Sequence, residues 1–115
     1  MIKSISIILP VYNEQLRLRS AFTNILNFLK RGNFKTEIIF VDDGSTDNSF
    51  IMISNFIKKF KKKISKKNKI KIIKSKDNLG KGSALKLGVK NAKFDWILTA
   101  DIDMSVSLFQ INIWL

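Results

Sequence analysis

The 115-residue sequence contains neither cysteine nor histidine. Their absence excludes disulfide bonds, thiolate and imidazole metal sites, cysteine nucleophiles and every catalytic triad that depends on histidine. Any bound metal ion would therefore need oxygen ligands such as carboxylates, carbonyl groups and water. The apolar runs are short of the roughly 20 residues that a membrane-spanning helix requires, and no secretory signal pattern opens the chain. The expected location is the cytoplasm.

Acidic residues are also scarce: nine stand against twenty-one basic ones, for a net charge of +12. Eleven of the basic residues fall in the segment from Lys58 to Lys76. A solvated lysine face is one interpretation of this segment, and a patch that attracts anionic lipid, holding the protein peripherally on the cytoplasmic face of a membrane, is another. Nucleic acid is an unlikely partner, because the sequence has little arginine and the segment has only one aromatic residue, Phe60, with which to stack bases.

Four short apolar runs rich in isoleucine and valine predict strands at residues 4–9, 37–41, 70–73 and 96–100. Between them, apolar side chains recur every three or four residues over 18–29, 50–64 and 81–91, which predicts helices. We expect Asn13 to cap the first helix, Gly32 to end it, and Ser45 or Thr46 to cap the second; a further helix start is indicated at 107–115. This alternation predicts a single α/β domain with a mostly parallel sheet and flanking helices.

In such a sheet, ligands bind outside the carboxyl ends of the strands. The stretches that follow the four predicted strands are "PVYNE" (10–14), "DDGSTD" (42–47), "DNLGKGSA" (77–84) and "ADIDMS" (100–105), and they hold seven of the nine acidic residues. Gathering acids at one edge of a basic protein is costly unless they share a cation. The pattern therefore favours one binding site over four unrelated turns.

Asp101 and Asp103 are the candidate metal ligands. Two carboxylates one residue apart at a strand end suit Mg²⁺ or Mn²⁺, which completes its shell with water and phosphate oxygens; a simple Asx turn is the alternative. Gly80 and Gly82 flank Lys81 at a predicted helix start, a combination that fits an anion such as a diphosphate. The alternative is a glycine-containing cap with a solvent-facing lysine.

The two remaining stretches offer groups for a nucleoside. Of the adjacent Asp42 and Asp43, one can accept a hydrogen bond from a base or a ribose hydroxyl while the other points inward. Tyr12 offers a flat apolar face and Glu14 an acceptor, in the stretch that begins at Pro10. Helix capping alone would explain residues 45–47.

The ordered motifs "SIILPVYNE", "EIIFVDDGSTDNS" and "NLGKGSALKLGVKNAKFDWILTADIDMS" resemble the N-terminal half of family 2 glycosyltransferases with the GT-A fold, most of all the polyprenyl- and dolichyl-phosphate sugar transferases. The resemblance covers residues 4 to about 110. It implies a nucleoside pocket at Tyr12 and Glu14, base contact by Asp43, a diphosphate near Lys81 and a paired-aspartate metal site. The pair reads "DID" rather than the usual "DAD", which is compatible if Ile102 faces the core, and Ser105 stands where some relatives have glutamine.

The resemblance further implies inverting transfer of a hexose from a nucleotide diphosphate sugar, of the UDP-glucose or GDP-mannose class, to a polyprenyl phosphate. That acceptor is already ionised and needs little help from a base, which suits a protein without histidine. Relatives are about twice as long, so residues 1–115 are expected to be the nucleotide-sugar-binding part, truncated before the acceptor half, and no catalytic residue can be named. A non-catalytic nucleotide-binding fragment, or a basic α/β domain that binds membrane or nucleic acid, is the alternative.

Overall fold

The computed structural model describes residues 4–32, 34–63, 66–75 and 77–103. Within these ranges strands and helices alternate, as the sequence predicted, and the helix suggested at 107–115 lies outside the described residues. The elements are β1 (Ser4–Val11), α1 (Leu18–Arg31), β2 (Lys35–Asp43), α2 (Ser49–Phe60), β3 (Lys69–Ser75), α3 (Lys81–Lys90) and β4 (Ile97–Thr99).

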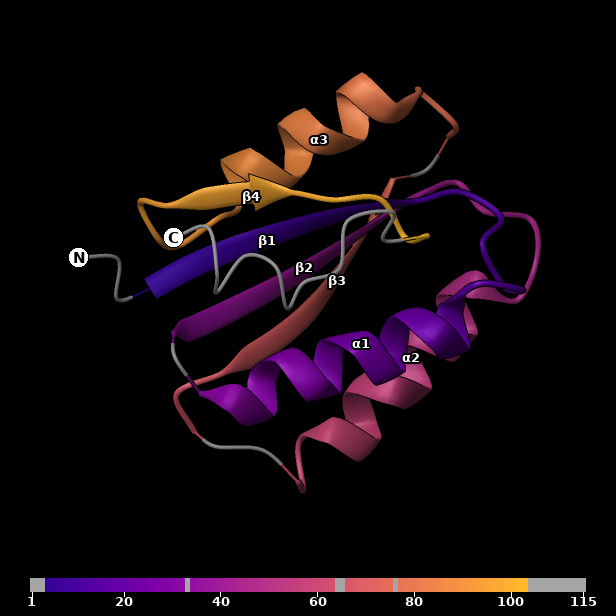
Figure 1. The fold of residues 1–115 in the computed structure, drawn as a ribbon. Coiled ribbons are helices and arrows are strands. Elements are labelled where there is room, and N and C mark those ends of the chain that lie inside the picture. Colours follow the sequence, from indigo (N-terminus) through magenta and orange to yellow (C-terminus); the bar gives the residue numbers. More distant parts are fainter. Residues whose placement is uncertain (1–3, 33, 64–65, 76, 104–115) are drawn as a thin grey trace.

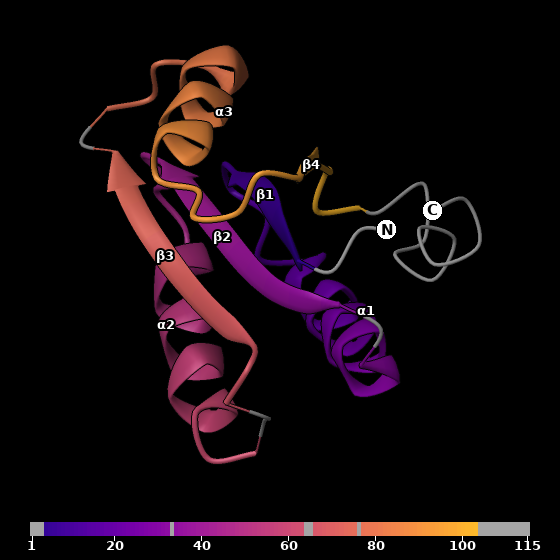
Figure 2. The same ribbon diagram turned by 90° about the vertical axis from the view of Figure 1, so that its left-hand side faces the viewer.

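All the strands run parallel, in the order β3-β2-β1-β4. The chain moves from β1 outward to β2 and β3, and then returns past β1 to add β4 on the other side. With right-handed crossovers, this reversal of direction places α3 on the face of the sheet opposite to α1 and α2, as Figures 1 and 2 show. The α/β class with a parallel sheet and flanking helices is therefore confirmed.

Strand alternation divides the core between the two faces of the sheet. Ile7 and Leu9 of β1 pack with α1 and α2, whereas Ile8 packs against α3. The rings of Phe22 and Phe56 stack between α1 and α2 with centroids 4.0 Å apart. Because both faces of β1 and β2 are covered, the sequence of these strands is apolar without the alternation of a half-exposed strand.

The predicted end of the first helix is confirmed. Gly32 follows α1 in the left-handed region, at φ 66°, and its N–H donates to the carbonyl of Leu29. No helix within the described part of the chain is both long enough and apolar enough to span a membrane.

Candidate functional site

A pocket of about 450 Å³ opens at the carboxyl ends of the strands. Strands β1 and β4 are neighbours in the sheet, but the chain passes from β1 to β2, which lies on the other side of β1. The loops that follow β1 and β4 therefore diverge, and the pocket lies in the crevice between them. Loops after β1, β3 and β4, the end of β2 and the first turn of α3 all contribute. Its lining residues are Pro10, Val11, Tyr12, Glu14, Arg17, Asp43, Asn78, Lys81, Ala84, Asp101, Ile102 and Asp103.

The structure brings most of the residues singled out in the sequence to this pocket. They include Tyr12, Lys81 and the paired aspartates Asp101 and Asp103. Ile102 is only 3% exposed and belongs to the main core, so its side chain faces inward, as the "DID" reading required. The flanking carboxylates of Asp101 and Asp103 are both exposed. Two of the nine predicted residues, Asp42 and Gly80, are not among the lining residues.

Asp42 is absent from the lining because β2 continues through both aspartates, so they project to opposite faces of the sheet. Asp42 is fully buried, and its Oδ1 accepts a 3.3 Å hydrogen bond from the N–H of Ser45. Within the described residues its Oδ2 has no hydrogen-bond partner. Asp42 is therefore the inward-pointing member of the pair.

Asp43 holds the loop that leads into α3. Its two carboxylate oxygens accept hydrogen bonds of 2.9 Å from the N–H groups of Leu79 and Gly80. The N–H of Gly80 is thus already used within the protein and does not face the pocket as an anion donor. Gly44 allows this close approach, because a Cβ at that position would lie 2.9 Å from the backbone nitrogen of Asn78.

Asn13 joins the loop after β1 to the loop after β2. It lies in the left-handed region at φ 52°, and its Oδ1 accepts from the N–H of Thr46 at 2.8 Å and of Asp47 at 3.3 Å. Its own N–H donates to Oγ of Ser45 at 2.9 Å. The predicted cap on the first helix is wrong, because α1 begins only at Leu18. Asn13 instead binds backbone N–H groups more than thirty residues away.

The same two loops are joined by a second set of hydrogen bonds. The N–H of Glu14 donates to Oγ of Ser49, and the N–H of Gln15 donates to Oδ2 of Asp47. Burial raises the pKa of Asp47, but hydrogen bonds from Ser49 and the Gln15 N–H outweigh it and hold the pKa below its ordinary value. The predicted cap by Ser45 or Thr46 is also wrong, because α2 starts at Ser49.

Two cations meet the carboxylates in the pocket. Nζ of Lys81 lies 2.6 Å from Oδ1 of Asp101, and Nη1 of Arg17 lies 3.1 Å from Oε2 of Glu14. Sequence reasoning missed Arg17, although it stands only three residues after Glu14, within reach of an ion pair. The pocket therefore offers positive groups for an anion beside the paired aspartates.

The donor set suits one kind of metal ion. Across the described ranges, no group of three or more acidic side chains is arranged to hold a metal. Asp101 and Asp103 provide two hard oxygen ligands at the mouth of a polar pocket. That set fits Mg²⁺ or Mn²⁺, which is commonly held by one or two carboxylates together with water and substrate phosphates.

Comparison with known proteins agrees with this arrangement. Residues 6–108 match the model of the family "Glycosyl transferase family 2". The dolichyl-phosphate beta-glucosyltransferase of Dictyostelium discoideum is 33% identical over 113 residues, which cover 94% of this chain and 33% of that protein. The chain thus spans about a third of the length of this curated relative.

Two solved structures share the fold. The mannosyltransferase PcManGT from Pyrobaculum calidifontis, in complex with GDP-Man and Mn²⁺, superposes with a TM-score of 0.76 at 19% identity, over 90% of this chain and 28% of that one. TarS 1-349 of S. aureus in complex with UDP-GlcNAc gives 0.68 at 24% identity, over 96% and 30%. At these identities the likeness establishes the fold alone, whereas the family match extends over most of the sequence. The chain belongs to glycosyl transferase family 2.

Proposed function

We propose that residues 1–115 form the nucleotide-sugar-binding part of a glycosyltransferase that moves a hexose from a nucleotide diphosphate sugar to a polyprenyl phosphate, with inversion. The observation that carries the proposal is the shared pocket. Tyr12 and Glu14 after β1, Lys81 on α3, and Asp101 and Asp103 after β4 all line it. An aromatic face, a cation and two carboxylates are the groups needed to bind a nucleoside, a diphosphate and a divalent ion.

In the proposed complex, the exposed ring of Tyr12 provides an apolar surface for the nucleoside, and Glu14 an acceptor for its hydroxyl or N–H groups. Lys81 adds positive charge where the diphosphate would lie. Asp101 and Asp103 would hold Mg²⁺ or Mn²⁺, which when bound acts as a Lewis acid toward the leaving diphosphate. The nucleotide sugars bound by the two structural neighbours, GDP-Man and UDP-GlcNAc, support this donor class.

At least three of the four carboxylates that line the pocket are engaged by groups of the same chain, which agrees with an acceptor that is already ionised. Asp43 is engaged by two backbone N–H groups, Glu14 by Arg17 and Asp101 by Lys81. A carboxylate bound in this way is a poor general base, and a hydroxyl acceptor would need one within reach. A lipid phosphate needs no such base, and the name of the Dictyostelium relative, a dolichyl-phosphate beta-glucosyltransferase, points to the same acceptor class.

Calorimetric titration with UDP-glucose and GDP-mannose, with and without Mn²⁺, tests the donor site. We expect metal-dependent binding that Asp103→Asn weakens at least tenfold, about 1.4 kcal/mol. Asp95→Asn is the matched control, because Asp95 is exposed and does not line the pocket. If Asp103→Asn binds the donor as tightly as the parent chain, Asp103 is not a metal ligand and this assignment fails.

A transfer assay with polyprenyl phosphate separates the enzyme from a nucleotide-binding module without turnover. Donor binding without transfer would support the nucleotide-binding module. If the chain is instead a basic domain, substitution of the lysines in 58–63 should abolish its binding to membrane or nucleic acid. Under our proposal, the same substitution leaves the affinity for the nucleotide sugar unchanged.

A further inference from the structure

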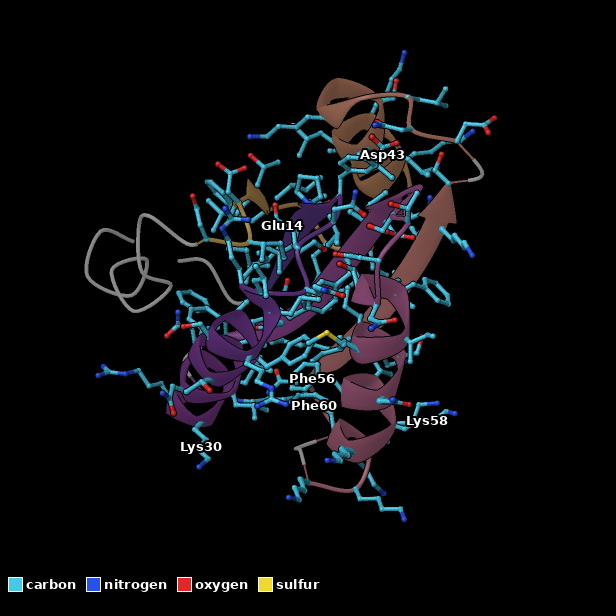
Figure 3. All side chains as sticks on the ribbon, turned by 90° about the vertical axis from the view of Figure 1, so that its right-hand side faces the viewer. Glu14, Lys30, Asp43, Phe56, Lys58 and Phe60 are labelled. Carbon is cyan, nitrogen blue, oxygen red and sulfur yellow. The ribbon has the colours of Figure 1, made fainter. Side chains whose placement is uncertain are left out.

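The lysine-rich segment lies mainly at the end of the sheet opposite the donor pocket. Figure 3 shows Lys30 and Lys58 at the lower end of the molecule, while Glu14 and Asp43 lie near the upper end. Parallel strands put all their amino ends on one edge, so the connections that precede β2, β3 and β4 meet there. Most of the acids therefore lie at the carboxyl edge, while many of the lysines lie at the amino edge.

A second pocket, of about 420 Å³, opens at this amino edge, and we call it the basic pocket. Five lysines line it, together with Phe94 and the strand residues Thr36 and Glu37. The lysines come from three separate connections of the chain, so their convergence is a product of the fold and not of the lysine run alone. They are Lys35, Lys66, Lys67, Lys69 and Lys93.

Glu37 is the one carboxylate among the residues that line the basic pocket, and it is committed to other partners. Its Oε2 pairs with Nζ of Lys71 at 3.0 Å, and its Oε1 accepts from Oγ of Ser6 at 2.8 Å and the backbone N–H of Lys93 at 2.9 Å. The side chain is 4% exposed. Glu37 therefore neutralises Lys71 and leaves the lysines of the pocket without an internal counter-charge.

Three of these ammonium groups, on Lys66, Lys69 and Lys93, have no hydrogen-bond or ion-pair partner within the described residues. Nζ of Lys67 donates to the carbonyl of Gly32 at 2.7 Å, and Nζ of Lys35 lies 5.6 Å from the ring centroid of Phe94. Like charges held in one hollow repel one another, and a concave surface of one sign concentrates counter-ions. The arrangement thus favours an anion.

We propose that the basic pocket binds a ligand that carries two or more phosphate groups, either a free polyphosphate or the headgroup of a phosphorylated lipid. Lysine ammonium groups bind phosphate as point charges, without the fixed fork that arginine offers to a single carboxylate or phosphate. A volume of about 420 Å³ leaves room for several phosphates between lysines from different loops. This site is separate from the donor pocket and does not depend on glycosyl transfer.

Binding of inositol trisphosphate, measured by calorimetry, and binding to phosphatidylcholine vesicles that contain phosphatidylinositol bisphosphate test the proposal. We expect at least one probe to bind, and the triple variant Lys66→Gln, Lys69→Gln and Lys93→Gln to weaken it by at least about tenfold. Vesicles with phosphatidylserine at equal total charge should bind less well, because their charges are not clustered. Binding to vesicles alone identifies a lipid headgroup, and binding of the free probe identifies a soluble ligand.

The matched control is Lys59→Gln, Lys62→Gln and Lys63→Gln, which removes the same charge from the same region but from residues outside the basic pocket. We expect it to change affinity by less than about twofold. Asp103→Asn should leave the affinity for inositol trisphosphate unchanged, which keeps the two sites distinguishable. Equal losses in the two triple variants, or no binding of either probe by the parent chain, would overturn the proposal.

Discussion

Replacing Gly88 with alanine tests how closely α3 is packed on the sheet. A Cβ at this position would collide with Cγ2 of Ile8 and would lie 3.2 Å from Cγ2 of Val41, and both side chains are fully buried. Neither can move without displacing the core, so α3 must lift from the sheet. Overpacking of this kind costs about 1–3 kcal/mol, against a gain of about 1 kcal/mol from alanine in a helix. We expect a net destabilisation of up to about 2 kcal/mol.

Gly82→Ala is the matched control for this prediction. Gly82 lies in the same helix, but no heavy atom outside its own helix turn and chain neighbours lies within 4 Å of its added Cβ. The same substitution should therefore stabilise the chain, by up to about 1 kcal/mol. Urea unfolding of both variants measures the difference through the midpoint at unchanged slope. If Gly88→Ala is as stable as Gly82→Ala, the close contact between α3 and β1 does not exist. Because α3 carries Lys81 into the pocket, Gly88→Ala should also weaken donor binding.

The remaining predictions concern three polar residues. Asn13→Ala should lower the free energy of unfolding by about 1–2 kcal/mol and weaken donor binding, while Asn13→Gly, which tolerates φ 52°, should lose less stability in urea unfolding; equal losses would show that backbone strain is unimportant. Burial raises the pKa of Glu37, but hydrogen bonds from the Lys93 N–H, Ser6 and Lys71 outweigh it and hold the pKa below its ordinary 4.5. The contribution of ionised Glu37 to stability is therefore present above pH 4.5 and is lost as the pH falls through the lowered pKa. Glu37→Gln should destabilise the chain by about 1–2 kcal/mol at pH 7 and by progressively less in acid. A loss of stability that does not change with pH would contradict this prediction. Lys81→Met should reduce donor affinity by about tenfold in calorimetry yet change stability by less than about 1 kcal/mol, because its ion pair is exposed; unchanged donor affinity would remove Lys81 from the site.

The order of strands and helices could be predicted from the sequence because each element leaves a local signal. Isoleucine-rich runs mark β1 and β2, which are buried on both faces, and a period of three to four residues marks α1. Gly32 ends α1 through its own left-handed conformation, which the residue type indicates directly. These features depend on neighbours in the chain, and they were predicted correctly.

The capping residues were not predictable in the same way. Asn13, Ser45 and Thr46 have the side chains of helix caps, yet they bind one another across thirty-two or more residues. The competing interaction is tertiary, since two loops that meet at one sheet edge satisfy each other's N–H groups before either helix begins. Asn13 and Ser45 do accept backbone N–H groups, as helix caps do. These N–H groups belong to the other loop, however, and not to the first turn of the helix that follows each residue.

The clustering of acids at the carboxyl edge also has a second physical explanation, which is that the carboxylates bind groups of the same chain. Asp43 and Asp47 accept backbone N–H groups, and Glu14 and Asp101 pair with cations of the same chain. Much of the repulsion expected from the sequence is therefore relieved within the protein, where the carboxylates join loops to one another. The density of acids alone does not require a metal ion. The proposed ion depends instead on Asp101 and Asp103, two exposed carboxylates on either side of a buried isoleucine, and Lys81 must exchange Asp101 for a phosphate before both can face the same ligand.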